Sequence, residues 1–571
     1  MIWRFREIDQ NRARTLADEL GQPLKVGEFL AAREFKTAAE VKAFIRAEIK
    51  DLPSPLSLTD MDKAVERLAA ALKRGEPVAV CGDYDADGLT ASALLGRGLK
   101  ELGHEVAVHI PNRLTDGYGL KPEAIRFLAE KGAKLIVTVD NGISDYEAVN
   151  EAASLGLDVI ITDHHKLPPV LPAALAVIDP HRDSLWSQSP PAGVGVAFML
   201  LCALKRHYQA TGLLAADQGP ALFDYLPLVA IGTVADLVPL TGPNRILVRH
   251  GLKFLAESRF PGLVALKKTS LRRQSKDGGG RVGPTDIGFR LAPRLNAAGR
   301  LGSAEPALEL LMAADGAAAA DLAAKLEDLN RERHLGQNKL CAEALERLEE
   351  EISPDSRTVV LGGEGWPRGL LGLAASKVAE VAGKPTVLFS LAEGLAVGSG
   401  RSAGNFNLYA ALNELRDMFI SFGGHAQAAG LTIEAQRLDD FKAALEQVAQ
   451  AAPGYSGESE LLADIAVSAG ELDLLAPPLA SLEPFGQGHP APVVIVRGAK
   501  VTDARPTDSG GSHHLKLILG GDLNRRTLIG FNLVHRLSEI GREMDLALSL
   551  EISEFKGEFS PSWRLMDFRP A

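Results

Sequence analysis

Residues 77–88 read PVAVCGDYDADG, an apolar run that ends in three aspartates spaced two residues apart. Two further runs of this kind follow, LIVTVDNG at 135–142 and DVIITDHH at 158–165. Amphipathic segments with helical spacing separate the three runs. Short apolar runs that alternate with such helices are typical of βαβ units around a buried parallel sheet. Because these sheets carry their chemistry at the carboxyl ends of the strands, the polar residues stand where a site is expected.

The first run offers three carboxylates, from Asp83, Asp85 and Asp87. On an extended stretch, side chains two residues apart point to one side, and Mg²⁺ and Mn²⁺ prefer such oxygen clusters. The stretch also resembles the start of an EF-hand loop, but position twelve of that loop is Leu94, where a bidentate glutamate is required. The pattern therefore favours a divalent-metal site of another kind. A solvated turn would not explain three acids at the end of an apolar strand.

The run at 158–165 ends in an Asp-His-His triplet, which is well placed for metal binding. Adjacent residues on an extended strand face opposite ways, so we expect different roles for the two histidines. We predict that His164 binds a metal and that His165 contacts a phosphate or orients a neighbour. Asp163 would hold a ring N–H.

Two more aspartates are ambiguous on their own. Asp140 belongs to an Asp-Asn-Gly sequence, which equally suits a simple turn. Asp236 lies in the apolar run IGTVADLVP at 231–239, where an unpaired charge is costly. Its partner is either a metal ion or a distant arginine or lysine.

Composition limits the class of protein. The chain has 571 residues, 46% of them hydrophobic and 24% charged, which excludes wholesale disorder and suggests three or four domains. The net charge of −11 argues against a basic nucleic-acid coat protein. Three distant cysteines exclude a disulfide scaffold and a structural zinc pair. A charged N-terminus and the lack of a long apolar run predict a soluble, cytoplasmic protein without membrane contact.

Changes of pattern along the chain predict five segments. They are an N-terminal helical segment (1–75), the parallel-sheet domain (76–302), a helical linker (303–352), a second, smaller α/β domain (353–452) and a β-rich region (453–571). In the last region, short β-like runs between turn signals predict a small barrel or sandwich.

The motifs DYDADG, VDNG, TDHH and TVADLVPL, in this order, resemble those of the DHH phosphoesterase superfamily. A fuller match is to its bacterial single-stranded-DNA-specific exonucleases. RLAPRLNAAGR (290–300) resembles their linking motif, GGHAQAAG (423–430) the Gly-His motif of their DHH-associated domain, and PFGQGHP (484–490) the start of their OB-fold domain. The chain departs from the family pattern at His489, where asparagine is usual, and at WPRG (366–369), which lacks a usual histidine.

The resemblance implies an α/β multidomain fold, with a parallel-sheet DHH domain, a long helical linker, a smaller DHH-associated α/β domain and a C-terminal OB-like β-barrel. It also implies two divalent ions, Mn²⁺ or Mg²⁺, that activate water for attack on a phosphodiester. The catalytic residues it assigns are Asp83, Asp85, Asp87, Asp140, His164, His165 and Asp236. Of these, the residues expected to bind the metal directly are Asp85, Asp87, Asp140, His164 and Asp236. Asp140 is the candidate for a ligand that bridges the two ions. For Asp83 the alternative to a place in the site's metal coordination is an indirect role, without contact to the metal.

Basic residues follow the metal motifs: the stretch 267–300 has nine, against two acids. For its first half, Lys267 to Arg281, a solvated loop is as good an interpretation as a DNA path. The family motifs favour phosphate contacts by side chains and by glycine backbone N–H groups, although Gly423-Gly424 also suits a tight turn. The predicted substrate-binding residues are Arg294, Asn296, Arg300, Arg401, Ser402, Gly423, Gly424 and His425. Within residues 497–542 of the last region, Phe531 is the main aromatic residue, so contacts to the DNA backbone should outweigh stacking.

The resemblance implies an exonuclease that degrades single-stranded DNA from 5′ to 3′ in repair and recombination, with a helicase and a single-strand DNA-binding protein as partners. One alternative is a DHH phosphodiesterase for short oligonucleotides or cyclic dinucleotides, which would need neither the OB-like region nor the linker. Another is a DNA-binding scaffold without activity, which the full set of seven site residues argues against. The chain has no Walker motif and no HExxH, and GRSAG at 400–404 is a weak match to a serine-hydrolase elbow.

Overall fold

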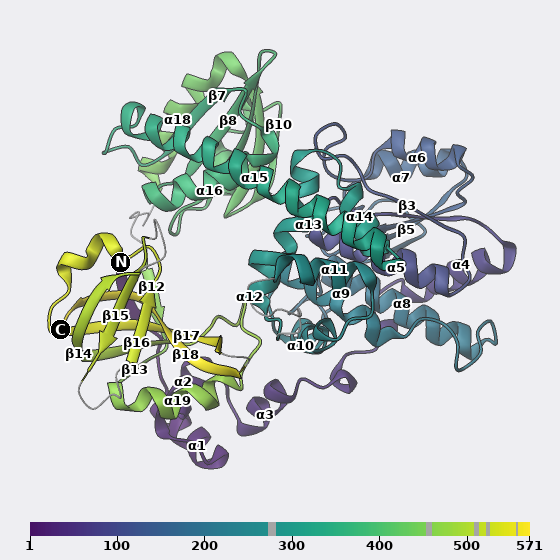
Figure 1. Cartoon of the computed structure of the whole chain (residues 1–571). Helices are drawn as coiled ribbons and strands as arrows, with labels where there is room; N and C mark the ends of the chain where they lie inside the picture. Colours follow the sequence, from purple (N-terminus) through teal and green to yellow (C-terminus); the bar gives the residue numbers. More distant parts are fainter. Residues whose placement is uncertain (272–280, 453–459, 508–512, 521–525, 556–557) are drawn as a thin grey trace. The chain divides into compact units, whose positions relative to one another are not determined.

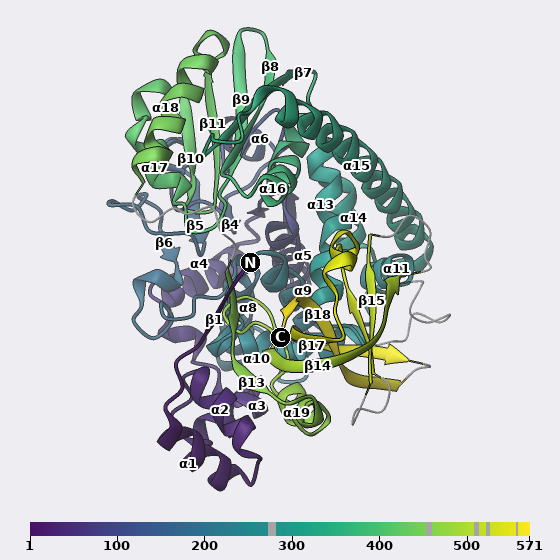
Figure 2. The same cartoon turned by 90° about the vertical axis from the view of Figure 1, so that its left-hand side faces the viewer.

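The computed structural model describes residues 1–271, 281–452, 460–507, 513–520, 526–555 and 558–571. The chain forms two compact units (Figures 1 and 2). The larger unit comprises residues 3–109, 119–292 and 461–571, and the smaller unit comprises 1–2, 110–118 and 293–460. Among the helices described, none has the length and hydropathy of a membrane span.

A five-stranded parallel sheet forms the centre of the larger unit, which confirms the predicted fold class. Its order is β3-β2-β4-β5-β6. The strands are β2 (Val78–Cys81), β3 (Val106–His109), β4 (Leu135–Val139), β5 (Asp158–Thr162) and β6 (Ala176–Ile178). Helices α6 (Pro122–Glu130) and α7 (Tyr146–Ser154) bury Ile125 and Val149 in one apolar cluster with sheet residues such as Ile136 and Ile161. The central strands are buried along their whole length, as the near-continuous apolar runs require.

Further helices of the larger unit pack beside this sheet. α5 (Ala86–Glu101), α8 (Gly193–Ala210) and α9 (Leu222–Ala235) contact one another, and α10 (Gly242–Ala256) packs along α9. α9 is buried from Tyr225 to Val234 because it is apolar all round. After α11 (Pro261–Ser270), α12 (Pro284–Asp286) continues into a π-helix, η4 (Ile287–Leu291).

The C-terminal part of the larger unit is a closed barrel, which confirms the predicted OB-like domain. Its sheet runs β13-β14-β15-β16-β18-β17, and β14 also pairs with β17, so the sheet closes on itself. The strands are β13 (Ile465–Val467), β14 (Val493–Pro506), β15 (Leu515–Leu519), β16 (Arg526–Gly530), β17 (Glu543–Phe555) and β18 (Glu558–Pro570).

The N-terminal helices pack on this barrel. Ala13 and Leu16 of α1 (Gln10–Leu20) and Phe29 of α2 (Leu24–Ala32) share one buried cluster with barrel residues such as Leu517 and Leu546. Helix α3 (Ala38–Arg46) completes the group, and α4 (Met61–Arg74) precedes β2. The N-terminal segment is not all helical, because β1 (Ile2–Phe5) pairs with β12 (Glu460–Ala463). This pairing joins segments more than 450 residues apart, which helical periodicity gives no means to detect.

One buried arginine connects three segments of the larger unit. Arg245 of α10 donates to the carbonyl oxygens of Phe44, Leu482, Glu483 and Pro484, at 2.8–3.1 Å. Its guanidinium lies 3.6 Å from the centroid of the Phe44 ring. Burial lowers the pKa of Arg245 to about 9. The parallel-sheet domain, the N-terminal helices and the start of the barrel domain are thereby joined through a single side chain.

The smaller unit contains the helical linker and the second sheet. α13 (Ala292–Leu301) and α14 (Glu305–Met312) lead into α15 (Gly316–Glu351), a single helix of 36 residues. The sheet order is β10-β11-β9-β8-β7, with strands β7 (Val359–Glu364), β8 (Thr386–Ala392), β9 (Leu395–Arg401), β10 (Ser421–His425) and β11 (Ala428–Glu434). Its helices are α16 (Leu371–Ala382), α17 (Leu408–Glu414) and α18 (Leu438–Ala451). The predicted long helical linker and smaller α/β domain are confirmed.

Candidate metal centre

The first motif is a strand-turn-helix rather than an extended stretch. β2 ends at Cys81, and the side chain of Asp85 caps the N-terminus of α5 by accepting from the backbone N–H groups of Asp87 (2.9 Å) and Gly88 (3.2 Å). The expectation that all three aspartates lie on one extended stretch is therefore wrong for Asp87, because Asp85 still has an extended backbone and α5 begins at Ala86. The turn brings Asp83 and Asp85 together, and the first turn of α5 carries Asp87.

Asp87 is held by the start of a second helix. Its carboxylate accepts from the backbone N–H groups of Gly193 (2.7 Å) and Val194 (3.0 Å), the first two residues of α8. Backbone N–H groups at a helix N-terminus stabilise a negative charge. The side chain is 1% exposed, so these two bonds fix its direction.

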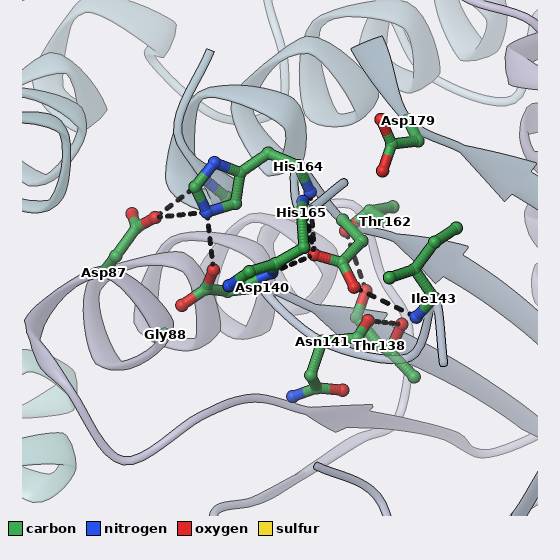
Figure 3. Close-up of polar contacts among 12 residues, drawn as sticks. Asp87, Gly88, Thr138, Asp140, Asn141, Ile143, Thr162, His164, His165 and Asp179 are labelled. Carbon is green, nitrogen blue, oxygen red and sulfur yellow. Dashed lines mark hydrogen bonds and ion pairs between the residues drawn. The ribbon is translucent and has the colours of Figure 1, made fainter. Parts of the chain in front are cut away.

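His164 lies at the centre of the carboxylates (Figure 3). Its Nε2 is 3.0 Å from Asp140 Oδ1, 3.6 Å from Asp236 Oδ2 and 3.7 Å from Asp87 Oδ2. Asp140 follows β4 directly with φ = 62°, a left-handed conformation that is uncommon for a residue other than glycine. Asp236 is the C-terminal cap residue of α9. Residues from the ends of two strands, β4 and β5, and of two helices, α5 and α9, therefore meet around this ring.

The donor atoms form three overlapping groups, within each of which the atoms lie at most 4.8 Å apart. The groups are Asp83, Asp85 and Asp140; Asp140, His164 and His165; and Asp87, His164 and Asp236. Asp140 and His164 each belong to two groups. All seven residues that the sequence predicted for the catalytic site thus lie together. Five carboxylates and two imidazoles suit Mn²⁺ or Mg²⁺, because hard divalent ions take oxygen ligands and imidazole is tolerated by Mn²⁺.

Asp163 binds the ring of His165, which confirms the expectation that Asp163 holds a ring N–H. The Asp163 Oδ1 atom lies 2.7 Å from Nδ1 of His165, and Oδ2 accepts from the backbone N–H of Ile143 at 3.0 Å. Burial lowers the pKa of His165, but the hydrogen bond and charge of Asp163 outweigh burial and raise the pKa to about 9. Burial and the charge of His165 lower the pKa of His164 to about 4. The neutral His164 is therefore suited to a metal, and the cationic His165 to a phosphate.

The carboxylates repel one another when no cation is bound. Burial, with the charge of Asp85, raises the pKa of Asp87 to about 7. Burial, with the charges of Asp87 and Asp85, raises the pKa of Asp236 to about 8. The same causes raise the pKa of Asp140 well above its ordinary value. A divalent cation would favour the ionised forms of all these groups.

Without metal, the free energy of unfolding is expected to fall as the pH rises from about 5 to 9. The folded protein holds protons on Asp87 (pKa about 7) and Asp236 (pKa about 8) that the unfolded chain releases near 3.8. The stabilisation that these bound protons provide is complete below the pKa of the unfolded chain, near 3.8. It is lost as the pH rises through the pKa values of Asp87 and Asp236 in the folded protein. Thermal unfolding in EDTA should show the loss, and saturating Mn²⁺ should remove it. A melting temperature in EDTA that is constant over this pH range would contradict the prediction.

Sequence reasoning missed the glycines that make room for the site. A Cβ atom on Gly193 would lie 2.5 Å from Cβ of Asp140, and one on Gly232 would lie 2.6 Å from Oδ1 of Asp87. The Gly-Val-Gly string at 193–195 was the only signal in the sequence for these glycines, and it matches no motif.

A buried aspartate beside the site was missed as well. Asp179 is fully buried near Thr162 (Figure 3) and accepts from the backbone N–H of His181 at 2.8 Å.

The eight predicted substrate-binding residues all belong to the smaller unit. Strand pairing places Arg401 and His425 on either side of one residue. Ala428 of β11 lies opposite Arg401 of β9 on one side and opposite His425 of β10 on the other. Ser402 donates its backbone N–H to the Gln427 carbonyl at 2.9 Å. Gly424, with φ = 148°, has no space for a side chain because a Cβ would lie 2.3 Å from the Ala428 oxygen.

The remaining predicted residues, Arg294, Asn296 and Arg300, lie on α13. Arg294 forms an ion pair with Glu327 of α15, and Arg300 donates to the Gly369 carbonyl at 3.4 Å. The basic residues Arg272, Arg273 and Lys276 of the predicted DNA path lie outside the described residues.

Three sequence families match separate parts of the chain. The DHH family N-terminal domain matches residues 77–233, the DHHA1 domain 355–451 and the RecJ OB domain 463–567. The single-stranded-DNA-specific exonuclease RecJ of Bacillus subtilis (strain 168) is 33% identical over 592 residues, which span 100% of this chain and 72% of the relative. The protein of the same name from Escherichia coli (strain K12) is 36% identical, over 98% of this chain and 97% of the relative.

Solved structures match over the whole chain. The crystal structure of RecJ in complex with Mn²⁺ from Thermus thermophilus has a TM-score of 0.83 and 30% identity, covering 100% of this chain and 80% of that one. The Mg²⁺ complex from the same organism has a TM-score of 0.77 and 28% identity, covering 100% and 78%. The resemblance that the four motifs indicated is confirmed at the level of sequence and of fold.

Proposed function

Because this chain belongs to the RecJ family of single-stranded-DNA-specific exonucleases, we propose that it degrades single-stranded DNA from the 5′ end in DNA repair and recombination. It is a metal-dependent exonuclease for single-stranded DNA. One observation carries the assignment of the site: all seven predicted residues meet in three overlapping groups of donor atoms.

The residues divide the chemistry among them. Asp83, Asp85, Asp87, Asp140, His164 and Asp236 would hold Mn²⁺ or Mg²⁺. When bound, the ions lower the pKa of a water molecule and neutralise charge on the phosphate. Asp140 belongs to two of the ligand groups, so it is the candidate for joining two ions. Asp83 stands beside Asp85 and Asp140 in one group, which favours direct coordination by Asp83 over an indirect role.

His165 would bind the scissile phosphate. Asp163 engages Nδ1 of its ring and thereby orients the imidazole, and Nε2 is the nitrogen that would donate to a phosphate oxygen. The side chain is 45% exposed, whereas His164 is buried, so substrate can approach the one ring while the other faces the carboxylates.

The OB-like barrel would bind the strand farther from its end. Phe531 is half exposed, and the Arg564 guanidinium lies 5.7 Å from its ring centroid. His514 meets the same ring edge-on at 4.9 Å between centroids. An aromatic face beside cations suits a nucleobase and its phosphate. We further propose that a helicase and a single-strand DNA-binding protein supply the substrate in the cytoplasm, because duplex DNA must be separated before such an enzyme can act.

An end-labelled substrate set tests the function. A single strand, a duplex of the same sequence and a dinucleotide are incubated with and without Mn²⁺. We expect metal-dependent release of mononucleotides from the single strand alone, beginning at a 5′ label. Cleavage confined to the dinucleotide would favour the phosphodiesterase for short substrates, and metal-independent binding without cleavage would favour a scaffold. Release that begins at the 3′ end would overturn the proposed direction.

Replacing Arg401 with alanine is expected to raise the KM for single-stranded DNA about tenfold, because a hydrogen bond to a charged group contributes about 1.5–3 kcal/mol. Its guanidinium donates to Ser399 Oγ at 3.1 Å, and burial and the charge of Arg113 lower its pKa. Two guanidinium groups that repel each other would gain a shared phosphate as partner. Steady-state kinetics would measure the change. The exposed Arg331→Ala is the control, and an equal rise in KM in both variants would contradict a specific role.

A further inference from the structure

Two large apolar side chains of the larger unit stand in solvent, and one of them directly follows Asp236 of the metal centre. Phe289 is 80% exposed, more than any other large hydrophobic residue in the described ranges, and Leu237 is 69% exposed. Single exposed hydrophobic residues are common and by themselves indicate nothing. Here the two residues line the same pocket, which gives them a shared role.

The pocket has a volume of about 160 Å³. Val234, Leu237 and Leu240 line it from the end of α9, Phe289 lines it from η4, and Phe485 from the loop before the barrel. A cavity of about 150 Å³ accommodates one benzene ring. The pocket therefore has the size and the apolar character for one flat aromatic ring and is too small for the side of a protein helix.

Its position connects it to the metal centre. Asp236, which shares a ligand group with Asp87 and His164, stands between the lining residues Val234 and Leu237. Leu237 has φ = 59°, a conformation that costs free energy for a residue with a Cβ atom. The backbone thus turns sharply at this point, with Asp236 in the metal centre and the Leu237 side chain in solvent.

The opposite wall has an unusual backbone as well. Phe289 is the middle residue of the π-helix Ile287–Leu291, and π-helical turns are rare and frequent at functional sites. The next residue, Arg290, has a side chain that is 41% exposed and pairs with Asp286 at 2.9 Å. An aromatic face with a cation beside it is what a nucleotide requires, since the base stacks and the phosphate is negative.

We infer that this pocket, between Leu237 and Phe289, receives one nucleobase of the single-stranded DNA substrate, which stacks on the Phe289 ring while the phosphate chain passes the metal centre. The inference rests on the proposed function and adds to it a base-binding position that depends on no particular sequence, because every base has an aromatic face. Phe289 is then a substrate-positioning residue. It lowers KM and leaves the hydrolytic step to the metal-centre residues.

An abasic scan with Phe289 variants tests the inference. A series of oligonucleotides carries one abasic nucleotide at successive positions from the 5′ end, and KM and kcat are measured with Mn²⁺. For the wild-type enzyme we expect KM to rise about tenfold at one position, since stacking on an aromatic side chain is worth about one tenfold step in affinity per base. Phe289→Ala should raise KM about tenfold on the intact strand, hold kcat within about twofold and abolish the abasic penalty at that position alone.

Two further variants exclude a loss of folding as the cause. Phe289→Trp retains an aromatic face and should restore wild-type KM and the abasic penalty. Phe223→Ala removes another half-exposed phenylalanine, at the opposite end of α9 from Asp236, and should behave as wild type. Wild-type KM in Phe289→Ala, or an abasic penalty that this variant retains, would overturn the inference while the enzyme remains active. A wild-type enzyme that cleaves no single-stranded DNA would instead overturn the proposed function itself.

Discussion

Asp140→Asn is expected to lower hydrolysis of single-stranded DNA by at least about 10²–10³-fold, the size of effect seen when one charge-stabilising group leaves an active site. Asp140 contributes to two of the three ligand groups, so its loss affects both candidate ion positions. It also lies 3.0 Å from Nε2 of His164, and a neutral amide there provides a weaker ligand. Single-turnover kinetics with Mn²⁺ would measure the loss.

The melting temperature shows whether the loss of hydrolysis in Asp140→Asn has a catalytic or a structural cause. Burial and the charges of four other aspartates raise the pKa of Asp140, so asparagine removes repulsion in the metal-free protein. Its melting temperature in EDTA should equal or exceed that of the wild type, and its gain with Mn²⁺ should shrink. The control Asp158→Asn changes the amino end of β5, where the carboxylate pairs with Arg67 at 2.6 Å, and should retain turnover. Near-normal turnover in Asp140→Asn would refute the assigned role.

The second large effect is expected from Gly193→Ala, one methyl group at the start of α8. Its Cβ would lie 2.5 Å from Cβ and 2.8 Å from Oδ1 of Asp140, closer than atoms can approach without displacement. The N–H of Gly193 also holds Asp87 at 2.7 Å, so any shift of α8 moves a second carboxylate. A displacement of about 1 Å in an active site costs about 10²-fold in rate. Overpacking should also lower the free energy of unfolding by about 1–3 kcal/mol.

Gly316→Ala is the matched control, because a Cβ there meets no atom within 4 Å and the residue begins α15. It should leave rate and stability unchanged or slightly improved, since alanine favours a helix. Measuring kcat and the affinity for Mn²⁺ in both variants distinguishes the two positions. Equal kcat in Gly193→Ala and wild type would show that α8 does not position the aspartates.

The sequence was informative where a feature is local. Buried parallel strands produce apolar runs, and each run here ends at a site residue, so Asp140 and His164 could be found by reading to the end of a strand. The order of the four motifs identified the superfamily. The second α/β domain and the β-rich region were predicted from the pattern of the chain, and the fuller resemblance to the exonucleases implied that the last region is an OB-like barrel. The five domain boundaries stay predictions, and so do the individual roles of the site residues.

What the sequence did not reveal depends on contacts between distant segments. Nothing near Gly193 indicates that its N–H faces Asp87, because 106 residues separate the two. The cap formed by Asp85 was obscured for another reason: aspartates at alternate positions suit an extended strand as well as a helix N-terminus. Pairing of β1 with β12 leaves no local pattern in four residues.

The packing of α1 and α2 on the barrel has a consequence for biosynthesis. The shared apolar cluster joins Ala13 and Leu16 to Trp563 and Phe568. The ribosome therefore completes these helices long before it completes the strands that they pack against. At about 5–20 residues per second, the nascent N-terminus remains without its partner for roughly half a minute to almost two minutes. During that time its apolar face is available to a chaperone or to another nascent chain. The residues of α1 and α2 thus reach their final place only after the barrel has been synthesised.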